Sequence, residues 1–538
     1  MTTVREATYQ VLRDLEMTKI FGNPGSTELP FLRDLPSDFS YVLALHERSA
    51  IGMGLGYALA RGKAAFVNVH SVASVGNGLS ALVDALYIHA PLVVTTGQQD
   101  RRHVLAEPFL VSRASEAAKP YVKWSYEPLR AEDVPAVIAR GYHLAMQPPR
   151  GPVFISIPMD DWTHECRPVD ARHVHPTVLP DPVALDEVVA ALNSAKNPVL
   201  IAGAQIEEDG GWEEAVALAE HLQADVYQPP LSPRWAFPRT HPLFRGSLLP
   251  AQQPLADQLA SYDTVVVLGA PIFLYYAYVP GTAIKPGTKL FQITNSSQHA
   301  SAGLAGSAIV GNVAVAARYL RAHAAARERG ASLPRKEPLS PDPERPITPS
   351  YLFSVLNRVM PRNAVIAEEC PSSKGDLDRQ LLSDQPRSFY SVPNGILGFG
   401  LPVAVGLQLS NPHRRVVCPV GDGSIQYSIQ ALWSAVQYKA EVIFIVLRNG
   451  DYSALKSFCD FTRVGRNVPG MDLPGIDIVK IAQGYGMPAQ EVAGPEELET
   501  VLKQAFASPG PRLISVQVAK GGETCMGMDQ SVNPPNYG

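Results

Sequence analysis

Short apolar runs alternate along the chain with longer stretches in which apolar residues recur at helical spacing. The runs cover residues 65–69, 92–96, 153–157, 199–203, 264–269, 416–420 and 442–447. Strands that are apolar along their whole length and separated by helices are typical of parallel sheets covered on both faces. The pattern therefore predicts an α/β protein with doubly wound parallel sheets.

Two proline-rich segments interrupt this alternation, at about residues 168–182 and 330–349. Both resemble linkers, because they combine frequent proline with weak hydrophobic periodicity. A chain of 538 residues is also too long for one hydrophobic core. We therefore predict three α/β domains, over residues 1–180, 181–340 and 341–538.

The first and third domains contain a weak internal sequence repeat, with matching positions 350 residues apart. The strand at 67–70 matches the strand at 417–420, and the segment at 56–60 matches 406–410. We interpret these domains as two copies of one α/β unit, with a different α/β unit between them. The copies differ where the strand ends, with His70 and Ser71 in the first and Gly421 and Asp422 in the third. Ligands of open parallel sheets bind beyond the carboxyl ends of the strands, so the two corners should carry different chemistry.

Composition narrows the class of protein. The net charge of -5 gives no basic surface that would favour nucleic acid as the main partner. The five cysteines form no CxxC pair, so neither a disulfide framework nor a zinc site is indicated. The N-terminus lacks the regions of a signal peptide, and the apolar runs are too short to span a bilayer. We expect a cytoplasmic enzyme with no membrane or nucleic-acid partner.

The segment Gly421-Asp422-Gly423-Ser424 ends an apolar strand and allows two interpretations. Asp422 could simply cap a helix in a glycine turn. Alternatively, it could hold a metal, because Asn449 follows 27 residues later, after a helix expected from about 427 to 437 and the next strand. One βαβ crossover would bring both side chains to neighbouring strand ends. Their oxygens suit Mg²⁺, and the amides of Gly423 and Ser424 suit a phosphate.

This spacing resembles the cofactor motif of the thiamine diphosphate-dependent decarboxylase superfamily. The resemblance implies that Mg²⁺ is bound by the side chains of Asp422 and Asn449 and by the carbonyl of Asp451. Gly421, Gly423, Ser424 and Tyr452 would bind the cofactor, with the amides of Gly423 and Ser424 facing its diphosphate. The family motif ends in Asn-Asn, whereas this chain has Arg448 before Asn449.

Thiamine also requires an acid that protonates its aminopyrimidine ring, and the candidate is Glu47. Five largely apolar residues precede it, and Gly52, Gly54 and Gly56 follow. A Glu at a helix start could instead only complement the helix dipole. The glycines lack the spacing and the acidic residue of a dinucleotide fingerprint, so we interpret them as allowing close helix packing.

The resemblance extends over nearly the whole chain and is carried by residues 21–31, 67–71, 122–128, 151–153, 269–273, 397–399 and 421–424. It is to superfamily members that remove CO₂ from an aryl 2-oxo acid and release an aldehyde. Such enzymes have pyrimidine-binding, middle and diphosphate-binding domains and form homotetramers with active sites at a dimer interface. By resemblance, Ser26 grips the substrate carboxylate, His70 relays protons, Gly395 and Leu397 position the cofactor, and Ala454 and Phe458 line the aryl pocket.

The chain departs from the family at two further positions and at its end. Tyr276 stands where members carry a second histidine, and it is a weaker acid than an imidazolium. Ser391 stands where they carry an aromatic pocket residue, which suggests a more polar or roomier site. The segment from Lys520 to Gly538 is longer than expected and could form a lid or a disordered tail.

Three alternatives stay open at this point. A related enzyme could join or split 2-hydroxy ketones or 2-hydroxyacyl-CoA with the same cofactor. A relative could bear a flavin or lack catalysis, although no clear nucleotide fingerprint is present. A binding protein without chemistry would require Glu47, Asp422 and Asn449 to coincide by accident.

Overall fold

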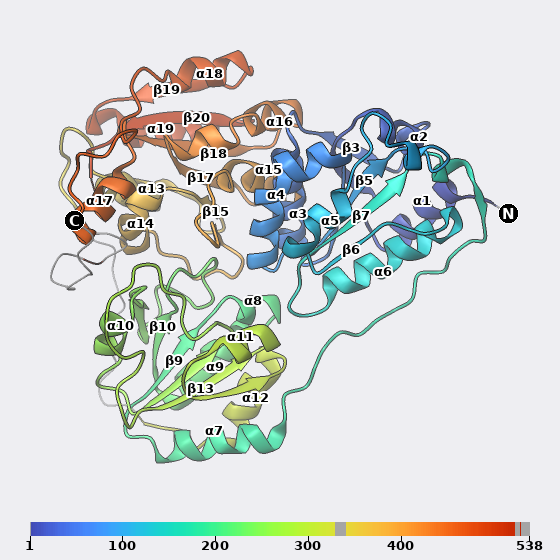
Figure 1. Ribbon diagram of the computed structural model, residues 1–538. Coiled ribbons are helices and arrows are strands. Elements are labelled where there is room, and N and C mark those ends of the chain that lie inside the picture. Colours follow the sequence, from blue (N-terminus) through green and yellow to red (C-terminus); the bar gives the residue numbers. More distant parts are fainter. Residues whose placement is uncertain (1, 329–339, 522–527, 529–538) are drawn as a thin grey trace.

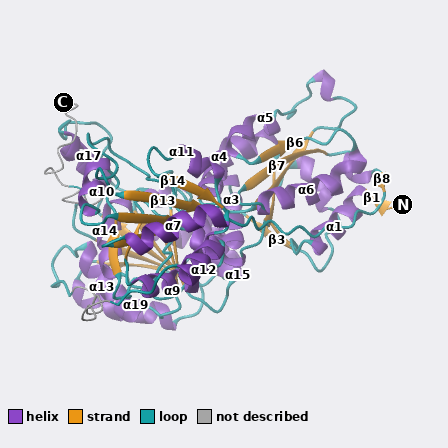
Figure 2. Ribbon diagram, turned by 90° about the horizontal axis from the view of Figure 1, so that it is seen from below, coloured by secondary structure: helices purple, strands orange, loops and turns teal. Residues whose placement is uncertain are grey.

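The computed structural model describes residues 2–328, 340–521 and 528. Figure 1 shows three lobes, with the first domain at the right, the third at the upper left and the middle domain below them. Each lobe contains one six-stranded sheet in which every neighbouring pair of strands is parallel. Helices lie on both sides of the strands (Figure 2). The predicted α/β fold with three doubly wound parallel sheets is therefore confirmed.

The first sheet has the strand order β3-β2-β4-β5-β7-β6. Its strands are β2 (Lys19–Asn23), β3 (Ser40–Leu43), β4 (Ala65–Val69), β5 (Leu92–Gln98), β6 (Trp124–Tyr126) and β7 (Pro152–Pro158). The helices are α1 (Val4–Asp14), α2 (Leu29–Leu32), α3 (Glu47–Arg61), α4 (Ser71–Tyr87), α5 (Ala114–Ala118) and α6 (Val134–Met146). A separate antiparallel pair joins β1 (Thr2–Thr3) to β8 (Glu165–Cys166). An extended segment then leads to the middle domain (Figure 1).

The middle sheet has the order β11-β10-β9-β12-β13-β14. Its strands are β9 (Pro198–Ala202), β10 (Asp225–Gln228), β11 (Phe244–Ser247), β12 (Thr264–Leu268), β13 (Lys289–Thr294) and β14 (Ser307–Val310). The helices are α7 (Pro182–Ser194), α8 (Gln205–Glu208), α9 (Trp212–Leu222), α10 (Gln252–Gln258), α11 (Ser297–Ala302) and α12 (Val313–His323). Of the second predicted linker, residues 329–339 lie outside the described residues.

The third sheet has the order β16-β15-β17-β18-β20-β19. Its strands are β15 (Val365–Glu368), β16 (Phe389–Ser391), β17 (Val416–Gly421), β18 (Val442–Arg448), β19 (Ala489–Val492) and β20 (Arg512–Gln517). The helices are α13 (Pro349–Val359), α14 (Lys374–Gln380), α15 (Gly400–Ser410), α16 (Ala431–Gln437), α17 (Ser453–Thr462), α18 (Ile478–Gly484) and α19 (Pro495–Ala507).

The strand orders of the first and third sheets correspond position by position, as we expected from the internal sequence repeat. Helices α3 and α15 occupy equivalent places and pack directly against each other. A Cβ added to Gly56 would lie 2.2 Å from the carbonyl oxygen of Val403, and one added to Gly406 would lie 2.0 Å from that of Met53. Glycine is therefore required at both positions because backbone meets backbone there. The interpretation of Gly56 as a packing residue is confirmed.

The segment after Asp422 differs from the prediction. We expected one helix from about 427 to 437, but the structure has a 3-10 helix, η7 (Ser424–Tyr427), and then α16 from Ala431. The positions involved, Ser424 to Gln430, combine buried side chains with tight turns, so hydrophobic spacing alone did not reveal the break. The amides of Gly423 and Ser424 therefore open a short 3-10 helix rather than an α-helix.

Among the described residues, none of the helices is long and apolar enough to cross a membrane.

Candidate active site

The polar residues predicted in the first domain lie at the carboxyl ends of adjacent strands. Ser26 follows β2, Glu47 follows β3, and His70 follows β4 directly, in a sheet where β2 separates β3 from β4. Ser26 is exposed, so its hydroxyl is accessible from solvent. One corner of the sheet therefore brings these predicted residues together.

Glu47 is the first residue of α3, whose start is capped by His46 through a hydrogen bond from the Arg48 amide to the imidazole. The Glu47 side chain is only 7% exposed and accepts a hydrogen bond of 2.9 Å from the Asn77 amide. A buried carboxyl group with one polar partner can exchange a proton with a bound heterocycle. The local structure thus suits the role that the resemblance implies.

His70 has a partner that the sequence analysis missed. Its Nδ1 lies 2.8 Å from Oε2 of Glu28, whose side chain is 1% exposed. The hydrogen bond and the negative charge of Glu28 raise the pKa of His70 against the opposing effect of burial, and the charge of Glu47 adds to the rise. Glu28 follows Ser26 closely in the chain, but no sequence pattern indicated that it would turn inward to His70.

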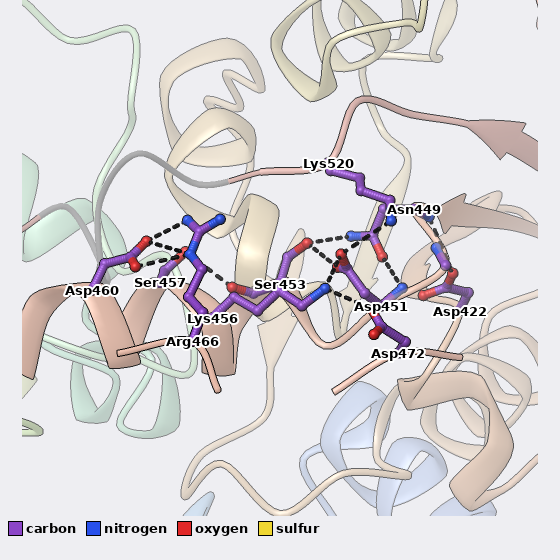
Figure 3. A network of polar contacts seen from close by, with 11 residues as sticks. Asp422, Asn449, Asp451, Ser453, Lys456, Ser457, Asp460, Arg466, Asp472 and Lys520 are labelled. Carbon is purple, nitrogen blue, oxygen red and sulfur yellow. Dashed lines mark hydrogen bonds and ion pairs between the residues drawn. The ribbon is translucent and has the colours of Figure 1, made fainter. Parts of the chain in front are cut away.

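In the third domain, Asp422 lies at the end of β17 and receives backbone hydrogen bonds from the neighbouring strand end. Its Oδ2 accepts from the amides of Asn449 and Gly450 at 3.1 and 2.7 Å, and its Oδ1 accepts from Gly423 at 3.0 Å. Figure 3 shows Asp422 beside Asn449 and Asp451. The predicted βαβ crossover therefore brings Asp422 and Asn449 together.

The hydrogen bonds of Asp451 and Asn449 determine which of their oxygens could bind a cation. The Asp451 carboxylate accepts from Ser453 and pairs with Lys456 at 2.8 Å, so its side chain is already satisfied (Figure 3). Asn449 uses its Oδ1 to accept from the Asp451 amide at 3.0 Å and keeps a second lone pair. These contacts leave the carbonyl of Asp451, rather than its carboxylate, as the available ligand.

The buried carboxylate of Asp422 also favours a cation at this position. Its side chain is 5% exposed, and burial raises its pKa, opposed by hydrogen bonds from Gly450, Gly423 and Asn449. A divalent cation would stabilise this buried carboxylate. In the described part of the chain, no group of three or more His, Cys, Asp or Glu residues could hold a metal. One carboxylate with amide and carbonyl oxygens is a donor set that fits Mg²⁺ shared with phosphate oxygens.

The other predicted cofactor residues lie in two places, Gly423 and Tyr452 beside Asp422, and Gly395 and Leu397 in the loop before α15. A Cβ on Gly423 would lie 2.6 Å from the Tyr452 ring, so these two residues are in contact. Gly395 has φ +78, a left-handed conformation that favours glycine, and is exposed. Leu397 is half-buried, and the neighbouring Gly398 carbonyl accepts from Arg48 at 3.2 Å. The contact places the predicted cofactor loop of the third domain against the start of α3.

Tyr276, predicted as a catalytic residue, forms an aromatic contact between domains with Phe458, predicted to line the pocket. The rings of Tyr276 and Phe458 meet edge to face with centroids 5.4 Å apart, and Tyr276 is 49% exposed. Ala454 lies one turn before Phe458 on α17 and is half-buried. Ser391 is buried, and its hydroxyl donates to Glu368 at 2.6 Å, which ties it to the sheet. Its place in the pocket stays a prediction.

The C-terminal segment, for which the sequence left a lid and a disordered tail open, falls largely outside the described residues, which include Lys520, Gly521 and Met528 of it. Met528 is buried in a cluster with Ala251, Ala277 and Phe461, against which Phe458 also packs. The choice between a lid and a disordered tail stays open.

Family models match all three domains of this chain. They describe the N-terminal binding domain, the central domain and the C-terminal binding domain of thiamine pyrophosphate enzymes, over residues 2–119, 185–320 and 372–516. The chain belongs to the thiamine pyrophosphate enzyme family. Its cofactor is therefore thiamine diphosphate, as the sequence motif indicated.

Relatives within this family cover almost the entire chain. Benzoylformate decarboxylase of Pseudomonas aeruginosa is 41% identical over 96% of this chain and 99% of its own length. The crystal structure of benzoylformate decarboxylase from Polynucleobacter necessarius has a TM-score of 0.95 at 39% identity, covering 97% of this chain and 100% of its own. A 4-hydroxybenzoylformate decarboxylase of Rhodococcus jostii has a TM-score of 0.93 at 40% identity, with the same coverage.

Proposed function

We propose that this enzyme decarboxylates an aryl 2-oxo acid of the benzoylformate class to an aldehyde and CO₂, with thiamine diphosphate and Mg²⁺. The observation that carries the proposal is the 41% identity to a benzoylformate decarboxylase over nearly the full length of both chains. The edge-to-face contact of Tyr276 and Phe458 supports it, because an aromatic surface between two domains suits an aryl substrate.

The proposed roles of the residues are those that the family resemblance implies, and their positions support them. Asp422, Asn449 and the Asp451 carbonyl would hold Mg²⁺, and the thiamine ring supplies an electron sink when the cofactor is bound. Glu47 would hold the proton on the aminopyrimidine. Ser26 would bind the substrate carboxylate at the exposed strand end, and His70 would move protons from the same corner. Tyr276 would donate a hydrogen bond from its hydroxyl.

We also propose that copies of the chain form a homotetramer with active sites at a dimer interface. The family resemblance supports this proposal, because in that family the cofactor lies between the first domain of one subunit and the third domain of another. Size-exclusion chromatography with light scattering measures the assembly, and an active monomer would contradict this proposal.

The test of the proposed reaction is CO₂ release from a panel of aryl and alkyl 2-oxo acids in the presence of thiamine diphosphate and Mg²⁺. We expect release from benzoylformate and 4-hydroxybenzoylformate, little from pyruvate, and none after removal of the cofactor. Glu47→Gln should lose most of the activity, by about 100-fold or more, and keep its fold by circular dichroism. Full activity of that variant would contradict the assigned role.

The same panel separates decarboxylation from carboligation. A putative acetolactate synthase large subunit of Mycobacterium tuberculosis is 28% identical over 95% of this chain. Formation of a 2-hydroxy ketone as the main product, with little free aldehyde, would favour a carboligase instead.

A further inference from the structure

Glu28 lies in the 3-10 helix η1 (Ser26–Glu28) after β2, and its carboxylate is surrounded by donors. Oε1 accepts from the Gly97 amide at 2.7 Å and from the Thr27 hydroxyl at 2.9 Å. Oε2 accepts from the Gly25 amide at 2.8 Å and contacts Nδ1 of His70 at 2.8 Å. The carboxylate is thus fixed from three neighbouring strand ends, β2, β4 and β5.

These contacts determine the proton position on His70. An ionised carboxylate only accepts hydrogen bonds, so Nδ1 of His70 must carry the hydrogen that points at Glu28. The Thr27 hydroxyl, 3.1 Å from the same Nδ1, gives its own hydrogen to Glu28 and can also only accept there. Nε2 makes no hydrogen bond to any residue within 2–328 and 340–521. Nε2 is therefore the ring atom available to a substrate.

The ring orientation is fixed as well. A Cβ added to Gly25 would lie 2.2 Å from Nδ1 and 2.3 Å from Cγ of His70, so the imidazole lies directly on the Gly25 backbone. Gly25 has an extended backbone, and the requirement for glycine is one of space. The ring thus has a backbone surface against it and a carboxylate at one end.

We propose that Glu28 is the positioning residue for His70, holding Nδ1–H so that Nε2 faces the substrate and exchanges the proton. The charged groups that face His70 are Glu28 and, from α3, Glu47. Glu28 makes a direct hydrogen bond, whereas Glu47 acts only through its charge. The proposal rests on the proposed function for the identity of the substrate, but the state of His70 can be measured without it.

The first experiment measures the pH dependence of diethylpyrocarbonate modification of His70, quantified by mass spectrometry of the peptide that contains it. The reagent reacts with neutral imidazole, so the midpoint of the reaction reports the pKa of His70. In Glu28→Gln the midpoint should move to lower pH, and in Glu28→Asp it should move less. Should Glu28→Gln fail to fold, Glu28→Asp still gives the comparison with the wild type.

Glu208→Gln is the matched control, because the side chain of Glu208 is also buried and pairs with a histidine, His89, at 3.0 Å. That pair lies at the junction of the three domains, in a recess that also contains Arg150, Arg234 and Arg387. Glu208→Gln should leave the His70 midpoint unchanged. An unchanged midpoint in Glu28→Gln would overturn the proposal.

The second experiment measures the pH profile of decarboxylation. Glu28→Gln should lower kcat by about tenfold or more and shift the limb that reports His70, with thiamine diphosphate affinity kept within about twofold. Glu28→Asp should recover part of the loss. A wild-type profile in Glu28→Gln would also overturn the proposal. If no 2-oxo acid is decarboxylated by the wild type, the proposed function fails, and the modification experiment alone decides the role of Glu28.

Discussion

The first and third domains have the same strand order but carry different groups at the same corner of the sheet. After β4 the first domain has His70, which contacts Glu28 and is the proposed proton-transfer residue. After β17 the third domain has Asp422, which accepts hydrogen bonds from three backbone amides and is the proposed cation ligand. One scaffold thus provides two kinds of site, because the strands fix the positions and the residues just beyond them fix the chemistry.

The two domains also meet through equivalent helices. Along α3 and α15, glycines allow the backbones to approach each other closely. Around the starts of these helices lies a buried polar network in which Arg48 pairs with Asp84 at 3.0 Å and Glu369 accepts from the amides of Gly398 and Gly400. The residues beyond the strand ends therefore differ between the two domains, whereas the interface of α3 and α15 preserves the symmetry of the repeat.

Removal of the cation ligand should have the largest effect. Asp422→Ala should weaken thiamine diphosphate binding in Mg²⁺ by at least about 100-fold, because the carboxylate is the only charged side chain expected to bind the ion. Fluorescence titration with cofactor at fixed Mg²⁺ measures the loss. Asp472→Ala is the control, since Asp472 contacts Lys456 but is 72% exposed. Unchanged affinity in Asp422→Ala would rule out the metal site.

The second largest effect is expected at the interface of α3 and α15. Gly406→Ala places a Cβ against the Met53 backbone and should destabilise the protein by about 1–3 kcal/mol or prevent folding. Gly484→Ala, in α18, is the matched control, because its Cβ would meet nothing within 4 Å. Urea denaturation of the cofactor-free protein compares the two. Equal stability of both variants would mean that the close approach of α3 and α15 does not limit the fold.

The buried polar network near the starts of α3 and α15 should make the stability of the protein depend on pH. Burial raises the pKa of Glu369 from 4.5 to about 8, against hydrogen bonds from Gly400 and Gly398 and the charge of Arg48. The folded chain therefore retains a proton that the unfolded chain loses, so stability falls as pH rises from 4.5 to about 8. Glu369→Gln cannot ionise and should show a smaller fall in the urea midpoint between pH 6 and 9. Glu107→Gln, at an exposed position, should keep the wild-type slope, and an identical slope in Glu369→Gln would refute this assignment.

The smallest effect is expected at the departure from the family motif. The side chain of Arg448 pairs with Glu491 on β19 and makes no hydrogen bond or ion pair with Asp422 or Asn449 in the described chain. Arg448→Asn should therefore change cofactor affinity by no more than about twofold and cost at most about 1 kcal/mol of stability. Isothermal titration with thiamine diphosphate checks this. A tenfold change in cofactor affinity would mean that position 448 also contributes to the proposed cation site.

Much of the fold could be predicted from hydrophobic spacing alone. The run at 65–69 coincides with β4, and the other fully apolar runs fall on strands, because a buried parallel strand must be apolar on both faces. The prediction was wrong after Asp422, where a 3-10 helix precedes α16. Tight turns with buried side chains leave no periodic signal, so such a break is invisible in the pattern.

By itself, the sequence determined the sheet type, the repeat of one unit and the residues just beyond its strands, since strand ends and crossover lengths are local properties of the chain. Only the tertiary structure decided that Glu28 turns inward to His70, that the Asp451 carboxylate is taken by Lys456, and that Arg448 pairs with Glu491. Each of these depends on which partner lies within hydrogen-bond distance, and that distance is set by packing between segments far apart in the chain.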